Sequence, residues 1–264
     1  MTTLVQPALN PSLPQYEPWF CRSMLQSAPV RLFCFPFAGG NATTFLSWQA
    51  HLGPQIELCA IQPPARGARL LEPPLDTMPA LLDALLPAIT PKLDRPFAFF
   101  GHSLGGLVAF ELARALRRQG LPLPDSLWIS GTEGPQTRQL RDTLHTLPDA
   151  GLIAALRDYN GTPAALLEDA ELMALVLPGV RGDFAVAERY AYQQEAPLDL
   201  PIHLLLADAD PWVDAERASG WARESSRPLQ TDTYAGDHFF IQPHMAAITA
   251  RLRQALTKHE VALP

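Results

Sequence analysis

The sequence is poor in cysteine, and the few it has do not form a framework. Its three cysteines in 264 residues are Cys21, Cys34 and Cys59. They are odd in number and far apart, and Cys34 and Cys59 lie within apolar stretches. We therefore expect buried free thiols, which excludes the class of small proteins held together by disulfides.

The chain also lacks an excess of basic residues and a long apolar run. It has 20 Lys and Arg against 27 Asp and Glu, a net charge of −7, and no basic stripe, so a nucleic-acid partner is not expected. No apolar run reaches the roughly 20 residues that span a bilayer. The first 20 residues contain no basic segment followed by an apolar one. We expect a soluble, cytoplasmic protein with no membrane partner, and a monomer.

Cofactor signatures are missing as well. The sequence contains no phosphate-binding loop, no dinucleotide fingerprint and no cluster of metal ligands. We therefore expect neither a cofactor nor a metal.

What the sequence does contain is a regular alternation of strand and helix patterns that begins at residue 30. Apolar, strand-like segments occur at 31–37, 56–62, 97–100, 126–133 and 201–208. Helical patterns separate most of them, which is typical of an α/β fold with a mostly parallel sheet and helices on both faces.

The alternation is interrupted at two places, and these define the expected domain organisation. Residues 1–29 are rich in proline without periodicity, so we expect a loosely held arm before a domain over 30–264. Residues from about 134 to 192 carry helical patterns and no convincing strand. They predict a helical lid inserted into the sheet domain.

The central motif is the segment Gly101-His102-Ser103-Leu104-Gly105, which separates an aromatic strand from an amphipathic helix. A strand, a sharp turn with glycines two residues on either side of a serine, and a helix make a nucleophile elbow. The serine hydroxyl then lies at a helix N-terminus, which favours developing negative charge. Ser103 is therefore the candidate nucleophile. The simpler interpretation is a glycine-rich turn whose serine caps the helix.

A serine nucleophile needs a histidine base and an orienting acid, which in an α/β-hydrolase follow in the order serine, acid, histidine. His238, in the loop YAGDHFF ahead of the last helix, is the candidate base, with His244 as the alternative. His203 lies within an apolar strand pattern and His259 in the tail.

The candidate acid follows the strand PIHLLLAD. Asp210 lies in the loop proper and is favoured over Asp208, which ends the strand. Asp214 is well placed to cap the next helix. Glu133, after the strand that follows the elbow, is a further alternative.

An oxyanion hole needs two backbone donors. One should be the N–H of Leu104, directly after the nucleophile. The other should come from the loop Phe37-Ala38-Gly39-Gly40, where we favour Ala38 and keep Phe37 as the alternative.

Five segments in this order resemble one family over nearly the whole domain. FPFAGGNATTF, QPPARGARLLEPP, FFGHSLGGLVAFELARAL, LLLADADPWV and GDHFF are together similar to a type II thioesterase of the α/β-hydrolase superfamily. The family often has His or Tyr in place of Phe37, and Met-Gly-Ala in place of residues 104–106. The proline-rich arm looks longer than is usual for it.

The resemblance implies an activity and a partner. Such stand-alone enzymes accompany polyketide and non-ribosomal peptide synthetases and remove acyl groups from the phosphopantetheine arms of acyl or peptidyl carrier proteins. A related serine ester or amide hydrolase, or an acyltransferase, would use the same triad. Because carrier proteins of this class are typically acidic, a local basic patch is expected, and Arg66 and Arg69 are its candidates.

Overall fold

The computed structural model describes residues 17–22, 25, 27–139 and 143–257. Within them, seven strands form one sheet in the order β1-β3-β2-β4-β5-β6-β7. Every neighbouring pair is parallel except β1 and β3, which are antiparallel. The strands are β1 (Phe20–Arg22), β2 (Val30–Phe35), β3 (Ile56–Ile61), β4 (Phe97–His102), β5 (Ser126–Ser130), β6 (Ile202–Ala207) and β7 (Gln230–Tyr234).

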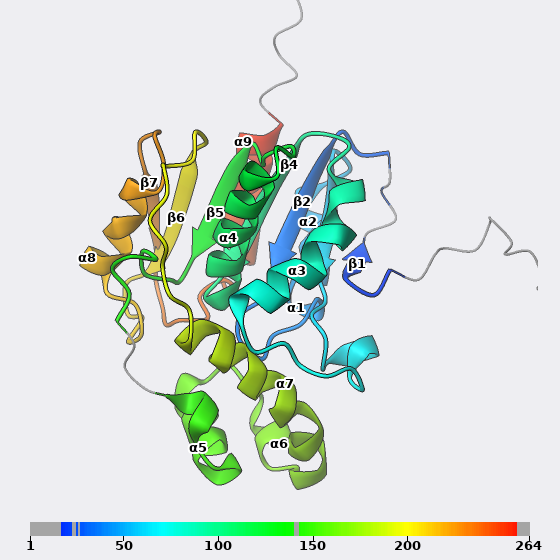
Figure 1. The fold of residues 1–264 in the computed structure, drawn as a ribbon, viewed down its shortest axis with the longest axis vertical. Helices are drawn as coiled ribbons and strands as arrows, with labels where there is room; N and C mark the ends of the chain where they lie inside the picture. The colour runs from blue at the N-terminus through cyan, green and yellow to red at the C-terminus, as the bar shows by residue number, and fades with distance from the viewer. Residues whose placement is uncertain (1–16, 23–24, 26, 140–142, 258–264) are drawn as a thin grey trace, which may run out of the picture.

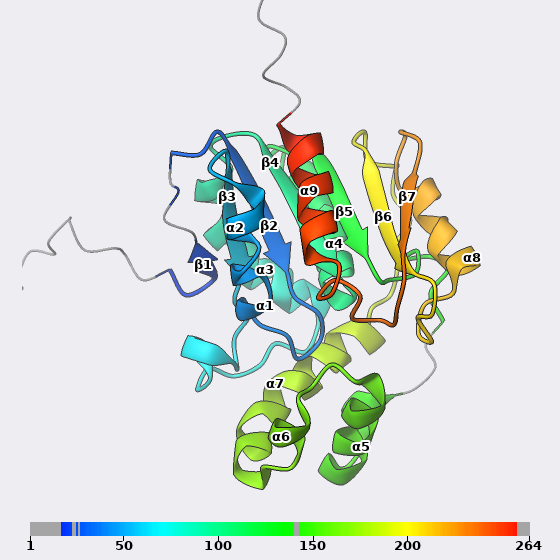
Figure 2. The same cartoon turned by 180° about the vertical axis from the view of Figure 1, so that it is seen from behind.

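Helices cover both faces of this sheet, as the alternation predicts. On the face toward the viewer in Figure 1 lie α3 and α4, and on the face toward the viewer in Figure 2 lie α2 and α9. The helices are α1 (Thr43–Leu46), α2 (Gln49–Leu52), α3 (Met78–Ile89), α4 (Leu104–Arg118), α5 (Asp149–Tyr159), α6 (Ala164–Leu167), α7 (Ala170–Glu188), α8 (Ala215–Ala218) and α9 (Met245–Leu256). None of the described helices is both long and apolar enough to pass through a bilayer.

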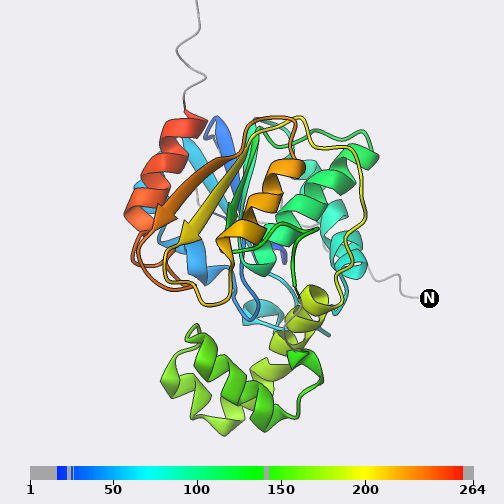
Figure 3. The same ribbon diagram turned by 90° about the vertical axis from the view of Figure 1, so that its left-hand side faces the viewer.

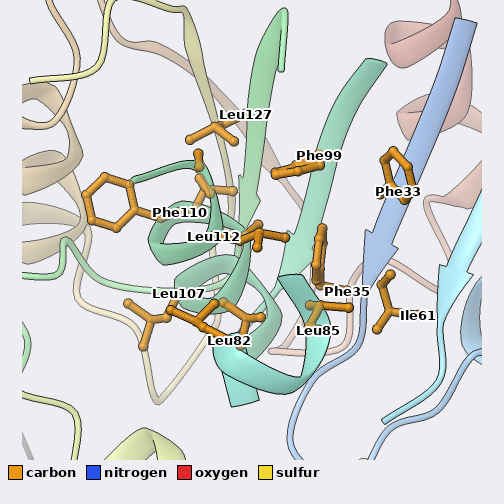
Figure 4. Close-up of a cluster of buried hydrophobic side chains, with 14 of the residues drawn as sticks. Phe33, Phe35, Ile61, Leu82, Leu85, Phe99, Leu107, Phe110, Leu112 and Leu127 are labelled. Atoms are coloured by element: carbon orange, nitrogen blue, oxygen red, sulfur yellow. The ribbon is translucent and has the colours of Figure 1, made fainter. Parts of the chain in front are cut away.

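The two faces of the sheet build two apolar clusters because successive side chains of a strand point to opposite sides. Phe33 and Phe35 of β2 pack with α3 and α4, whereas Leu32 and Cys34 pack with α1, α2 and α9. Figure 4 shows the first cluster, in which Leu85 of α3 and Leu112 of α4 lie beside Phe35. Cys34 and Cys59 are fully buried free thiols, as expected, and Cys21 is a half-buried one.

The prediction for the N-terminal arm missed a strand. Phe20–Arg22 pairs antiparallel with β3, and Trp19 and Phe20 are buried against the core. Such a short strand has no periodicity of its own, and it exists because β3 would otherwise be an open edge. Residues 1–16 of the expected arm lie outside the described residues.

The inserted segment lies beyond the carboxyl ends of the strands, below the sheet in Figure 3. Its described residues carry α5, α6 and α7 and form no strand between 143 and 192. These helices share an apolar cluster of their own, which includes Leu152, Leu156 and Met173. Leu172 and Leu175 of α7 lie outside this cluster and are 46% and 50% exposed.

Candidate active site

Ser103 sits in the strained turn that a nucleophile elbow requires. Its φ is 54° and its ψ is −119°, a backbone conformation that costs energy for any residue with a side chain. A Cβ at Gly101 would lie 2.1 Å from the Gly105 oxygen, and one at Gly105 would lie 2.1 Å from the Phe35 oxygen. Strand β4, helix α4 and the end of β2 therefore approach so closely that only glycine fits on either side of Ser103.

His238 and Asp210 are paired as predicted. His238 Nδ1 lies 2.7 Å from Asp210 Oδ2, and both side chains are almost fully buried. The second oxygen of Asp210 accepts a hydrogen bond of 2.8 Å from the Trp212 N–H. With a proton on Nδ1 facing the carboxylate, the neutral ring has its lone pair on Nε2, the form that a general base needs.

The alternative residues have other partners. Asp208 accepts the Gly236 N–H, Asp214 caps α8 by accepting the Arg217 N–H, and Glu133 pairs with Arg217. His244 lies directly before α9, and its Nε2 lies 2.8 Å from the Ala235 oxygen. His203 lies in β6, stacked on Trp128, and His259 falls outside the described residues.

The loop after β2 forms a tight turn over residues 37–40. The Gly40 N–H donates to the Phe37 oxygen at 2.8 Å, and Gly39 has a φ of +78°, which glycine adopts at little cost. The Gly39 N–H donates to Asp183 Oδ2 at 2.7 Å, so it is not available to a ligand. Among the described residues, the N–H groups of Ala38, Phe37 and Leu104 have no such partner.

His102, next to the serine, is fully buried at the end of β4. Its Nδ1 lies 3.0 Å from Ser130 Oγ, and its ring centroid lies 5.0 Å from that of His238. Burial, and then the nearby His238, hold the pKa of His102 well below its ordinary value. His102 is therefore neutral at neutral pH and places no positive charge beside His238.

Ser103 and His238 open onto one cavity of about 650 Å³. Ser103, Leu104 and His238 line it from the sheet domain, together with Phe37 and Ala38. The inserted segment contributes the opposite wall, which is largely apolar. This wall includes Leu144, Leu156, Leu166, Met173, Val176, Val180 and Phe184.

The expectation for Arg66 and Arg69 is wrong. Both are buried, at 8% and 7% exposure, so they do not form a basic docking patch. Arg66 pairs with Asp183, and Arg69 pairs with Glu72 and lies 4.2 Å from the centre of the Trp19 ring. Charged residues in a loop are ordinarily solvated, and the sequence carried no signal that helix α7 would cover this one.

Comparison with known proteins identifies the family. The family model described as a thioesterase domain matches residues 30–256. The chain belongs to the thioesterase family. This thioesterase is 38% identical to the gramicidin S biosynthesis protein GrsT of Aneurinibacillus migulanus, over 86% of the chain and 89% of that protein.

Solved structures agree with this assignment and confirm the α/β-hydrolase fold. The type II thioesterase BorB from the borrelidin biosynthetic cluster matches with a TM-score of 0.82 and 33% identity, covering 92% of this chain and 98% of that one. The RedJ thioesterase from the prodiginine pathway of Streptomyces coelicolor matches with a TM-score of 0.81 and 36% identity, covering 88% and 87%. The thioesterase is thus a hydrolase that acts on thioesters.

Proposed function

We propose that this protein is a stand-alone, type II thioesterase that hydrolyses acyl groups from the phosphopantetheine arm of carrier proteins in polyketide or non-ribosomal peptide biosynthesis. The observation that carries the proposal is that Ser103 and His238, which is paired with Asp210, line one cavity with an apolar wall. Two findings support the substrate class. The chain belongs to the thioesterase family, and the similar proteins BorB and RedJ come from the borrelidin cluster and the prodiginine pathway.

The proposed chemistry is acyl transfer to serine followed by hydrolysis. His238 accepts the proton of Ser103 as its oxygen attacks the thioester carbonyl, and the N–H groups of Ala38 and Leu104 stabilise the oxyanion. His238 then protonates the departing thiol and activates a water that releases the acid. Asp210 holds the ring in the correct tautomer and stabilises its charged form. Phe37 N–H remains the alternative to that of Ala38.

The cavity dimensions and lining support an acyl substrate. A volume of about 650 Å³ is within the range of small-molecule sites. The wall formed by the inserted helices is largely apolar. Transfer of an aliphatic or otherwise weakly polar acyl chain from water to this wall is therefore favourable. We propose that the acyl thioester is delivered by an acyl or peptidyl carrier protein.

The test is hydrolysis of a panel of acylated carrier proteins, followed by mass spectrometry of the carrier. The wild-type protein should return the free phosphopantetheine thiol, and Ser103→Ala should lower turnover by several orders of magnitude because triad members act as a unit. A serine-directed fluorophosphonate should label the wild type and spare Ser103→Ala.

A matched pair of small substrates separates this function from a related ester hydrolase. An acyl-pantetheine thioester should be cleaved faster than the oxygen ester with the same acyl group. Faster cleavage of the oxygen ester, with acyl-carrier proteins left intact, would overturn the proposal while keeping the serine hydrolase chemistry.

A further inference from the structure

Arg66 and Asp183 form a buried, two-point ion pair that the proposed mechanism does not use. Arg66 Nη1 lies 2.5 Å from Asp183 Oδ2, and Nη2 lies 2.8 Å from Oδ1. Their side chains are 10% and 12% exposed. The pair joins the loop after β3 to helix α7, two segments separated by 117 positions in the chain.

The same two side chains hold the turn that follows β2. Asp183 Oδ2 accepts the Gly39 N–H at 2.7 Å, and Arg66 Nη1 donates to the Gly40 oxygen at 3.0 Å. Arg66 Nε also donates to the Pro64 oxygen at 3.0 Å, which fixes the guanidinium within its own loop. The Asp183 carboxylate thus fixes the N–H of Gly39, and the Arg66 guanidinium fixes the carbonyl of Gly40.

This turn needs external support because its own sequence does not define it. Glycine residues at two of its four positions have wide conformational freedom, and within the described part of the chain the turn has one internal backbone hydrogen bond, from the Gly40 N–H to the Phe37 oxygen. Hydrogen bonds from charged groups are stronger than those between neutral ones. The contacts to Gly39 and Gly40 are therefore the ones that set the direction of the neighbouring Ala38 N–H.

We propose that Arg66 and Asp183 are positioning residues, which aim the Ala38 N–H at the oxyanion by holding residues 37–40. The proposal rests on the proposed function, because it requires Ala38 as an oxyanion donor. It also gives helix α7 two roles. Helix α7 carries Asp183, and it lines the acyl cavity with Met173, Val176 and Val180.

The main test is Asp183→Asn, which keeps the shape of the side chain and removes its charge. Removing an oxyanion donor costs 10²–10³ in kcat, so misaligning one should lower kcat by about 10–100-fold and change KM by less than about threefold. Arg66→Lys, which keeps the charge and loses the two-point geometry, should have the same effect. The rate at which a fluorophosphonate modifies Ser103 should fall in parallel, because the phosphonyl oxygen uses the same donors.

Arg69→Lys is the matched control. Arg69 lies in the same loop, is equally buried, and is paired with Glu72, but its side chain donates to Glu72 and to the Gln62 oxygen and to no residue of the turn. Arg69→Lys should lower the thermal unfolding midpoint about as much as Arg66→Lys does, while its kcat stays near that of the wild type. An equal loss of kcat in Arg69→Lys and Asp183→Asn would overturn the proposal.

A second variant separates positioning from folding. A buried ion pair can often be replaced by apolar residues without loss of stability, so Arg66→Met combined with Asp183→Leu can fold as stably as the wild type. That double variant should still be slow, and wild-type kcat in it, or in Asp183→Asn, would refute the proposal. If the wild type cleaves no carrier-bound thioester, the proposed function fails on its own, while the Ser103 labelling rates still test the role of the pair.

Discussion

Asp210 and His238 are joined by a contact of 2.7 Å, whereas Asp208, two residues earlier, accepts the Gly236 N–H at 2.9 Å and does not contact that histidine. The side chain of Asp210 is 2% exposed, while Asp208 is exposed at the loop surface. The two carboxylates follow the same strand, so they form a natural pair of variants for testing which one acts as the acid.

Asp210→Asn should lower kcat by about 10⁴, the cost of the corresponding change in serine proteases, because an amide favours the wrong tautomer of the histidine. Asp208→Asn should keep kcat within a few-fold and lower the free energy of unfolding slightly, through the weakened bond to Gly236. Steady-state kinetics on an acyl-pantetheine thioester and urea unfolding measure both. If Asp208→Asn proves the slower enzyme, the acid assignment is wrong.

Glycines of the insertion provide a second test. Gly179 lies inside the continuous helix α7, where a Cβ would lie 2.7 Å from the Ala65 oxygen. Gly179→Ala should therefore destabilise the protein by about 1–3 kcal/mol through overpacking, despite the helix propensity of alanine.

Gly151→Ala in α5 is its control. The nearest atom to a Cβ there is 3.5 Å away, an ordinary contact, so this change should stabilise the protein by about 0.5–1 kcal/mol. Urea unfolding of the two variants should give shifts of opposite sign. Equal stabilisation of both would mean that α7 moves away from Ala65 without cost.

The sequence predicts the parts of the site that depend on local patterns or on chain order. The elbow could be predicted because Gly101, Ser103 and Gly105 lie in one short segment, and His238 and Asp210 because each follows a recognisable strand. The structure brings them together as expected. Their catalytic roles stay predictions.

Features that depend on contacts between distant segments could not be predicted. Nothing near Arg66 indicates that Asp183, on another element, would bury it, and a charged loop residue is ordinarily assigned to the surface. Strand β1 was missed because three residues show no periodicity, and its pairing depends on the edge of β3.

The pH dependence of stability should contain a contribution from His203. This histidine is 6% exposed in β6 and stacks on Trp128 at 4.0 Å between ring centres. Burial, and then the charge of Arg251, lower the pKa of His203 from 6.5 to about 4, and Asp232 opposes this shift. The unfolded chain takes up a proton near pH 6.5 and the folded protein near pH 4, so stability falls as the pH drops between these values.

His203→Phe keeps the stacking and removes the titration. Between pH 6.5 and 5 the free energy of unfolding of the variant should fall by about 1–2 kcal/mol less than that of the wild type. Urea unfolding at several pH values measures this difference, and because His102 is present in both proteins its own titration cancels. Parallel curves for the two proteins would show that His203 is already protonated or exposed in the folded state.

The inserted helices should differ in how readily they open. The C-terminal half of α7 is held to the sheet domain by Asp183 and by the close approach of Gly179 and Gly182 to the loop at residues 65–75. Helices α5 and α6 lie farther from the sheet in Figures 1 and 2, and α5 is joined to the acid loop through Tyr159, which stacks on Trp212 at 4.2 Å.

We therefore expect amide hydrogens of α5 and α6 to exchange faster than those of residues 180–188, because fewer buried contacts must break to expose them. Modification of Ser103 by a long-chain fluorophosphonate should slow exchange in α5 and α6 by filling the cavity that they cover. Residues 180–188 also line this cavity, but their exchange should change less because their contacts with the sheet domain already protect them. Hydrogen exchange followed by mass spectrometry resolves these segments. Exchange in α5 and α6 as slow as in β4 and β5, with and without the probe, would show that this part of the insertion is a fixed wall and that substrate enters without its movement.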